Sequence, residues 1–179
     1  MHKIVLIEDR RSRMEIYLEN GESDVDKLSK LEYLDLYGPD DAKNNISKSD
    51  YSFLQKYQLI IAHRSALLET SNTSAINELY EYCKSNKKDL ILFSGGIAQS
   101  SYFEDGFNVL LINSKVFYHQ RLFAFLDDYS NEENEIKLIE LKNRLLTSLN
   151  ITKNPNNKIL KKKIDVDLSG YSIDINTLV

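Results

Sequence analysis

The stretch Lys3-Ile4-Val5-Leu6-Ile7-Glu8-Asp9 near the start of the chain decides the fold class. Its four consecutive aliphatic residues do not alternate with polar ones, which is typical of a strand buried on both faces of a parallel sheet. Two carboxylates follow directly, where such a strand ends. The stretch therefore predicts an α/β fold whose polar residues gather at the carboxyl edge of a parallel sheet.

The same apolar pattern returns along the chain and predicts four more strands, over residues 31–37, 59–62, 90–93 and 108–112. Helical spacing or composition predicts helices over residues 10–20, 76–83 and 118–128, whereas residues 40–49 are polar and predict a loop. Alternating strands and helices imply crossover connections and a sheet covered on both sides. We therefore expect a flavodoxin-like five-stranded parallel sheet, with helices on both faces, over residues 1–129.

The pattern changes after residue 129. Residues 134–149 are rich in Glu, Lys and Leu and predict an additional helix, within residues 130–150, whose apolar face is broader than that of a fully solvated helix. A polar linker is expected over residues 151–157. Beyond it, alternating apolar residues flank Ser169-Gly170, and a two-residue turn there places all of them on one face of a β-hairpin: Ile164, Val166, Leu168, Tyr171, Ile173 and Ile175.

This C-terminal hairpin needs a surface to dock on, because an isolated hairpin is marginally stable in water. Its apolar face can cover an edge of its own domain, meet a second copy of the chain, or bind a different protein. The polar linker would let the hairpin reach away from the domain, which favours an intermolecular role. The six apolar residues are therefore candidate interaction residues, and the expected partner is another protein or a homo-oligomer.

The polar residues at the strand ends resemble those of the receiver domain of two-component response regulators, over roughly residues 1–129. In that family an acidic pair ending the first strand binds magnesium, and an aspartate ending the third strand accepts a phosphoryl group. A Ser or Thr ends the fourth strand and a Lys ends the fifth. Here Glu8 and Asp9 match the acidic pair, Ser94 the hydroxyl and Lys115 the lysine.

The chain departs from that family at the phosphoacceptor position, which holds His63. Losing the aspartate removes the nucleophile and one magnesium ligand, and two carboxylates alone make a poor site for a cation that prefers several oxygen ligands. The resemblance therefore implies a pseudo-receiver with no metal, no cofactor and no catalytic residue. Its expected function is that of a regulatory or scaffold protein that acts by protein–protein interaction.

A second interpretation gives the strand ends a ligand. His63, Arg64, Ser94 and Lys115 could bind a small anion or phosphate, with the Ser94-Gly95-Gly96 turn presenting backbone N–H groups, in a sensor or an enzyme. The plainer alternative is that Asp9 and Lys115 form an ion pair and that the glycines make a tight turn. The sequence contains neither common Gly-rich nucleotide-binding motif, so it indicates no nucleotide cofactor.

The composition argues against several further classes of protein. The 179 residues carry a net charge of −4, which argues against non-specific nucleic-acid binding by the whole chain, and the lysine-rich stretch at residues 158–163 is interpreted as a solvated lead-in to a strand. The single Cys83 excludes an internal disulfide or a Cys-rich zinc site. No apolar run is long enough for a membrane span, and no signal-peptide pattern is visible. We therefore expect a cytoplasmic protein that contacts no membrane.

Overall fold

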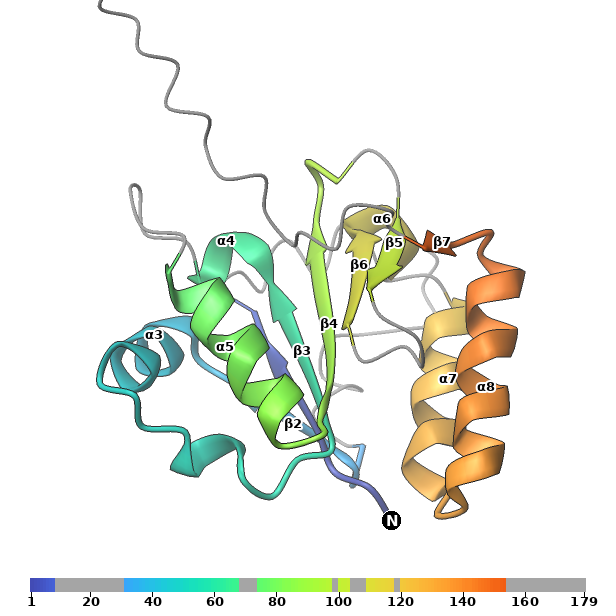
Figure 1. The fold of residues 1–179 in the computed structure, drawn as a ribbon, viewed down its shortest axis with the longest axis horizontal. Helices are drawn as coiled ribbons and strands as arrows, with labels where there is room; N and C mark the ends of the chain where they lie inside the picture. The colour runs from blue at the N-terminus through green and yellow to red at the C-terminus, as the bar shows by residue number, and fades with distance from the viewer. Residues whose placement is uncertain (9–30, 68–73, 98–99, 104–108, 118–119, 154–179) are drawn as a thin grey trace, which may run out of the picture.

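The computed structural model describes residues 1–8, 31–67, 74–97, 100–103, 109–117 and 120–153. They form an α/β fold around a seven-stranded sheet with the order β2-β1-β3-β4-β6-β5-β7 (Figure 1). Five neighbouring strands run parallel: β2 (Leu34–Tyr37), β1 (Ile4–Ile7), β3 (Leu59–His63), β4 (Asp89–Ser94) and β6 (Val109–Asn113). The predicted helix at residues 10–20 and the predicted C-terminal hairpin lie outside the described residues.

The predicted α/β class and mostly parallel sheet are confirmed, and the sheet is compatible with a flavodoxin-like fold. The prediction of five strands, all parallel, was wrong, because the sheet is mixed. Strand β5 (Ser101–Phe103) pairs antiparallel with β6, and β7 (Thr152–Lys153) pairs with β5. Strand β7 lies inside the segment predicted as a polar linker, and Ile151 just before it is buried.

The helices are α3 (Pro39–Ser47), the 3₁₀ helix η1 (Ser52–Leu54), α4 (Arg64–Leu67), α5 (Ser74–Ser85), α6 (Ser114–Phe117), α7 (Gln120–Asn131) and α8 (Glu135–Ser148). Helix α3 replaces the loop predicted over residues 40–49. Pro39 is well tolerated in the first turn of a helix. The carboxylates of Asp40 and Asp41 in the same turn are stabilised by the positive end of the helix dipole. None of the helices in the described residues is long and apolar enough to cross a membrane.

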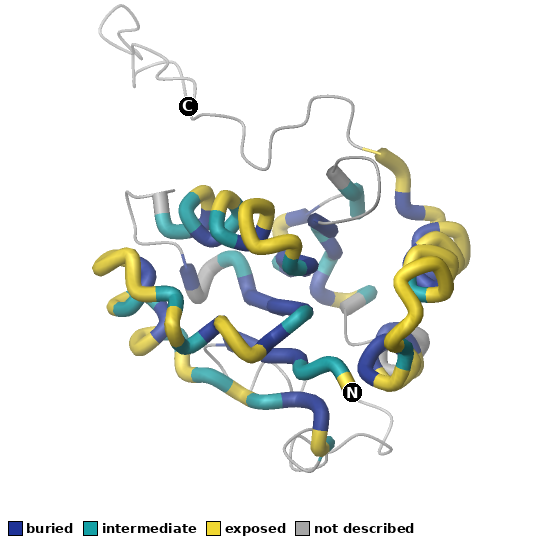
Figure 2. The backbone as a smooth tube through the Cα atoms, turned by 60° about the horizontal axis from the view of Figure 1, so that its bottom comes forward, coloured by how far each residue is buried: buried dark blue, intermediate teal, exposed yellow. Residues whose placement is uncertain are grey.

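Helices cover both faces of the sheet. Helices α3 and α5 lie on one face, and α7 and α8 lie on the other (Figure 1). Because successive strand residues point to opposite faces, Val5 and Ile7 pack with α3 and α5, whereas Ile4 and Leu6 belong to the cluster with α7 and α8. Burial on both sides explains the unbroken apolar strands, while α8 is exposed along much of its length (Figure 2).

A buried ion pair ties α8 to the sheet. Lys142 Nζ on α8 lies 2.6 Å from Asp89 Oδ2 at the start of β4, and the two side chains are 8% and 7% exposed. The hydroxyl of Tyr129 on α7 donates a hydrogen bond of 2.7 Å to the same oxygen. Burial raises the pKa of Asp89, and Lys142 and Tyr129 only partly offset this effect. Helix α8 is therefore held to the core by a specific polar contact as well as by apolar packing.

We expect Lys142→Met to destabilise the protein by about 3–5 kcal/mol at pH 7, because it leaves Asp89 buried and charged without its cation. The folded-state pKa of Asp89 then lies above its unfolded value, so the penalty grows as the pH rises through the folded pKa and shrinks as the pH falls toward about 4. Urea unfolding at both pH values measures it. The matched double variant Asp89→Asn/Lys142→Met should lose less stability at pH 7, and equal losses would contradict the prediction.

Candidate functional site at the carboxyl edge of the sheet

The strand ends bring most of the predicted site residues to one edge of the sheet. The parallel register pairs Ile7 with Ala62, His63 with Phe93, and Ser94 with Asn113, so β1, β3, β4 and β6 end at similar levels. This edge carries Glu8, His63, Arg64, Ser94 and Lys115. Asp9 lies outside the described residues, and so does the Asp9–Lys115 ion pair considered above.

His63 is a core residue at this edge. Its side chain is 3% exposed, and its ring packs edge-on against Phe93 with the ring centroids 4.8 Å apart. Glu8 is also nearly buried, at 9% exposure. A group that accepts a phosphoryl from a donor in solution must be reached by that donor, so the burial of His63 disfavours a phosphoacceptor role at this position.

The turn after β4 uses its own polar groups. The Ser94 hydroxyl accepts a hydrogen bond of 3.3 Å from the backbone N–H of Gly96, and the N–H of Ile97 donates to the Ser94 carbonyl at 3.2 Å. Gly95 and Gly96 are exposed. These bonds account for Ser94 as part of a tight strand-to-loop turn, which was the plainer interpretation of the sequence.

Asn113 organises this edge, a role that the sequence analysis missed. Its side-chain amide donates to the carbonyl of Ile97 at 2.7 Å, and its side-chain oxygen accepts from the backbone N–H of Lys115 at 2.9 Å. Its own backbone N–H donates to Ser100 Oγ. An amide side chain can donate and accept at once, so Asn113 connects the end of β6 to the segment after β4. The Lys115 side chain itself is exposed.

Two buried polar atoms at the edge have no hydrogen-bond partner among the described residues: Arg64 Nε and Ser114 Oγ. Ser114 is fully buried. These residues begin α4 and α6, and both helices contact β4, which lies between β3 and β6 in the sheet. An unsatisfied buried polar group costs about 1–3 kcal/mol, so a ligand that supplied hydrogen bonds here would recover free energy. Nothing in the sequence pattern singled out Ser114.

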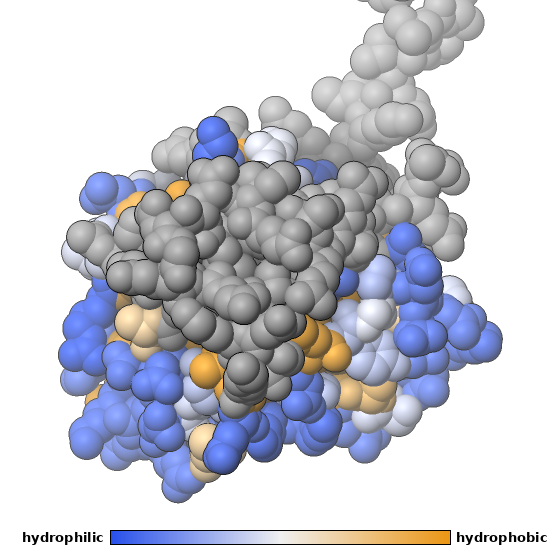
Figure 3. Space-filling view, turned by 180° about the vertical axis from the view of Figure 1, so that it is seen from behind, coloured by the Kyte–Doolittle hydropathy of each residue, from blue (hydrophilic) through white to orange (hydrophobic). Residues whose placement is uncertain are grey.

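A second candidate surface lies on α8, far from the strand ends in the chain. Ile136 is 70% exposed and Ile139 is 48% exposed, and both are among the few large apolar side chains that the described residues leave in solvent. Helical spacing places Glu140, Asn143 and Thr147 beside them, and all three are exposed. We call these five residues the outer face of α8. Seen from behind, the described surface is mainly hydrophilic (Figure 3).

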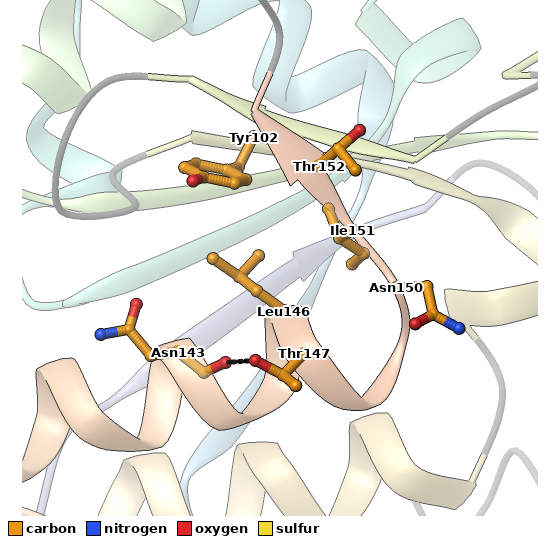
Figure 4. Close-up of a pocket in the computed structure, with 7 residues that line it drawn as sticks. All are labelled: Tyr102, Asn143, Leu146, Thr147, Asn150, Ile151 and Thr152. Carbon is orange, nitrogen blue, oxygen red and sulfur yellow. Dashed lines mark hydrogen bonds between the residues drawn. The ribbon is translucent and has the colours of Figure 1, made fainter.

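A groove continues the outer face of α8 toward the edge of the sheet. It has a volume of about 430 Å³ and is lined by Tyr102, Asn143, Leu146, Thr147, Asn150, Ile151 and Thr152. Figure 4 shows the ring of Tyr102 and the side chain of Leu146 on opposite sides of this space, with α8 below and β7 above. The Thr147 hydroxyl donates to the Asn143 carbonyl at 3.0 Å, so it is already satisfied within the helix.

Comparison with known proteins found no matching family model, no matching curated protein and no matching solved structure. Within the described ranges, no group of three or more His, Cys, Asp or Glu side chains could hold a metal ion. The described residues therefore offer two candidate functional surfaces, the carboxyl edge of the sheet and the outer face of α8.

Proposed function

We propose that this chain is a receiver-like regulatory or scaffold protein that binds another protein and accepts no phosphoryl group at the end of its third parallel strand. The strand-end residues support the receiver-like interpretation, and the buried His63 supports the loss of phosphotransfer. The observation that carries the interaction proposal is the exposure of Ile136 and Ile139 on α8.

The outer face of α8 has the composition of a small docking surface. Burying one large aliphatic side chain contributes about 1.5–3 kcal/mol, and the solvent-exposed Ile136 contributes little of this to folding. The surrounding rim is polar, as in protein interfaces. It includes the exposed carboxylates Glu135 and Glu140 together with Lys137, while Glu133 just before the helix is paired with the N-terminal amine. The partner that fits this surface presents apolar side chains surrounded by basic ones.

The proposal predicts that Ile136→Glu/Ile139→Glu abolishes partner binding without unfolding the protein, because both side chains lie in solvent. The full chain and this variant are each used as bait in an extract of the native host. A stoichiometric protein should bind the full chain, and the variant should lose it at least about tenfold, the equivalent of 1.4 kcal/mol.

The matched control is Asn77→Glu, which adds a charge to an exposed position on α5, on the opposite face of the sheet. It should retain the same protein. Equal capture by all three baits would show that the outer face of α8 is not the binding surface.

A second measurement tests the loss of phosphotransfer. Incubating the protein with a small phosphodonor and magnesium should give no stable acyl phosphate, because the third-strand aspartate is replaced by the buried His63. Intact-mass analysis followed by peptide mapping measures the outcome. A phosphoryl group located on a carboxylate at the edge of the sheet would contradict the pseudo-receiver assignment.

A second candidate function is binding of a small anion at the carboxyl edge, and the unpartnered Arg64 Nε and Ser114 Oγ favour it. A guanidinium and a hydroxyl both donate hydrogen bonds to phosphate or carboxylate oxygens. Ser94 is used in the hydrogen bonds of the turn and His63 is buried. Both residues would therefore contribute less directly to anion binding than the sequence suggested. The nearly buried Glu8 at the same edge opposes an anion electrostatically.

If this second function is correct, inorganic phosphate raises the melting temperature of the protein, because a ligand that binds only the native state stabilises it by mass action. Arg64→Lys should reduce the increase, since lysine lacks the planar donor set of arginine. Lys84→Ala, at an exposed position in the last turn of α5 and therefore near the amino end of β4, should leave the increase unchanged. No increase in the unmodified protein would remove the support for an anion site.

A further inference from the structure

We propose that the C-terminal segment, residues 158–179, binds the outer face of α8 in the same molecule and covers the surface that the partner protein would use. The regulatory meaning of this contact rests on the proposed function, but the contact itself is testable without any partner. The segment lies outside the described residues, whereas the surface on α8 lies within them.

The chain leaves the described structure beside this surface. Ile151 is 6% exposed, and Thr152 and Lys153 pair with Ser101 and Tyr102 of β5. Ile151 and Thr152 also line the groove next to α8 (Figure 4). The sheet therefore holds the chain up to Lys153, next to the groove.

The dimensions of the segment fit α8. The 14 residues of α8 form a helix about 21 Å long. One arm of the predicted hairpin, from Ile164 to Leu168, is about 17 Å long when extended. The chain from Lys153 to Lys163 spans at most roughly 33–36 Å, so the hairpin can reach any part of α8 from its attachment point.

The apolar surfaces also match. The predicted hairpin would place six apolar side chains on one face, and an isolated hairpin is only marginally stable. The outer face of α8 exposes Ile136 and Ile139, and the adjoining groove contains Tyr102 and Leu146. Contact between the two surfaces would remove apolar area from water on both sides. It would also stabilise the predicted hairpin, because a hairpin that packs against a helix is more stable than an isolated one.

Charge complementarity supports the same contact. The lead-in to the predicted hairpin is basic, with Lys158 and three consecutive lysines at residues 161–163. The predicted arms carry Asp165, Asp167 and Asp174, so the complementary charge comes from the lead-in alone. Glu135 and Glu140 are exposed on the first half of α8 beside the exposed Lys137, whereas Glu133, just before the helix, forms an ion pair of 2.8 Å with the N-terminal amine. Lysines on the segment would therefore meet the acidic rim that we assign to the partner's basic residues.

A tether favours contact within one molecule. A segment attached through only residues 154–157 has an effective concentration in the millimolar range, far above the concentration of a second copy in a dilute solution. The C-terminal segment is then a built-in competitor, and a partner protein must displace it to reach α8. Partner binding would thus depend on the charge and integrity of the C-terminal segment.

Thiol labelling in the full chain tests this contact. Ile139→Cys and Asn143→Cys place single reactive thiols on the outer face of α8. The native Cys83 interferes little, because it is buried and burial raises its pKa to about 12. We expect both engineered thiols to react slowly, and to react at least about tenfold faster when Val166→Asp/Ile173→Asp disrupts the apolar face of the segment.

The control thiol is Asn77→Cys on α5, whose labelling rate should be the same with either C-terminal segment. Fast labelling at both α8 positions with the native segment would overturn the proposal. Protection that disappears on dilution would also overturn it, because the occupant would then be a second copy. If the α8 thiols are unprotected while Ile136→Glu/Ile139→Glu still abolishes partner capture, the intramolecular cover fails and the proposed function stands.

Discussion

The ion pair between Asp89 and Lys142 is the interaction on which the position of α8 depends. Each charge alone would be costly in this apolar setting, so the two groups must meet, and Tyr129 supplies a further hydrogen bond to Asp89. Apolar packing tolerates small rotations of a helix, whereas a pair 2.6 Å apart does not. With Lys142 directed toward the sheet, Leu141 and Leu145 are buried and the face that carries Ile136 and Ile139 points to solvent.

The central strands could be predicted because burial on both faces leaves a direct trace in sequence. Ile4–Ile7 is apolar at every position, and all four residues are buried. Helix α3 left a weaker trace, since only Ala42 and Ile46 are buried in it. The edge strand β7 left none, because both of its residues are exposed and its pairing depends on β5, which has only three residues.

The candidate site was predictable in place but not in detail. Parallel strands end together, so the sequence indicated which residues would follow the strand ends, and the described ones among them lie at one edge. Whether a residue there is buried depends on its neighbour on another strand, as with His63 and Phe93. The role of Asn113 depends on the carbonyl of Ile97 in a different loop, and the pairing of Asp89 with Lys142 joins two elements that no local pattern connects.

The two candidate surfaces differ in how far contacts within the fold explain the residues that they carry. At the carboxyl edge, Ser94 and Asn113 are used in local hydrogen bonds and His63 packs in the core. Among the described residues there, Arg64 Nε and Ser114 Oγ are the buried polar atoms without a partner. On α8, an isoleucine that is 70% exposed contributes little to the stability of the folded chain. The free energy available from burying that side chain is realised only when another surface covers it. A contact made by α8, whether with the C-terminal segment or with a partner, therefore accounts for Ile136 and Ile139 in a way that folding alone does not.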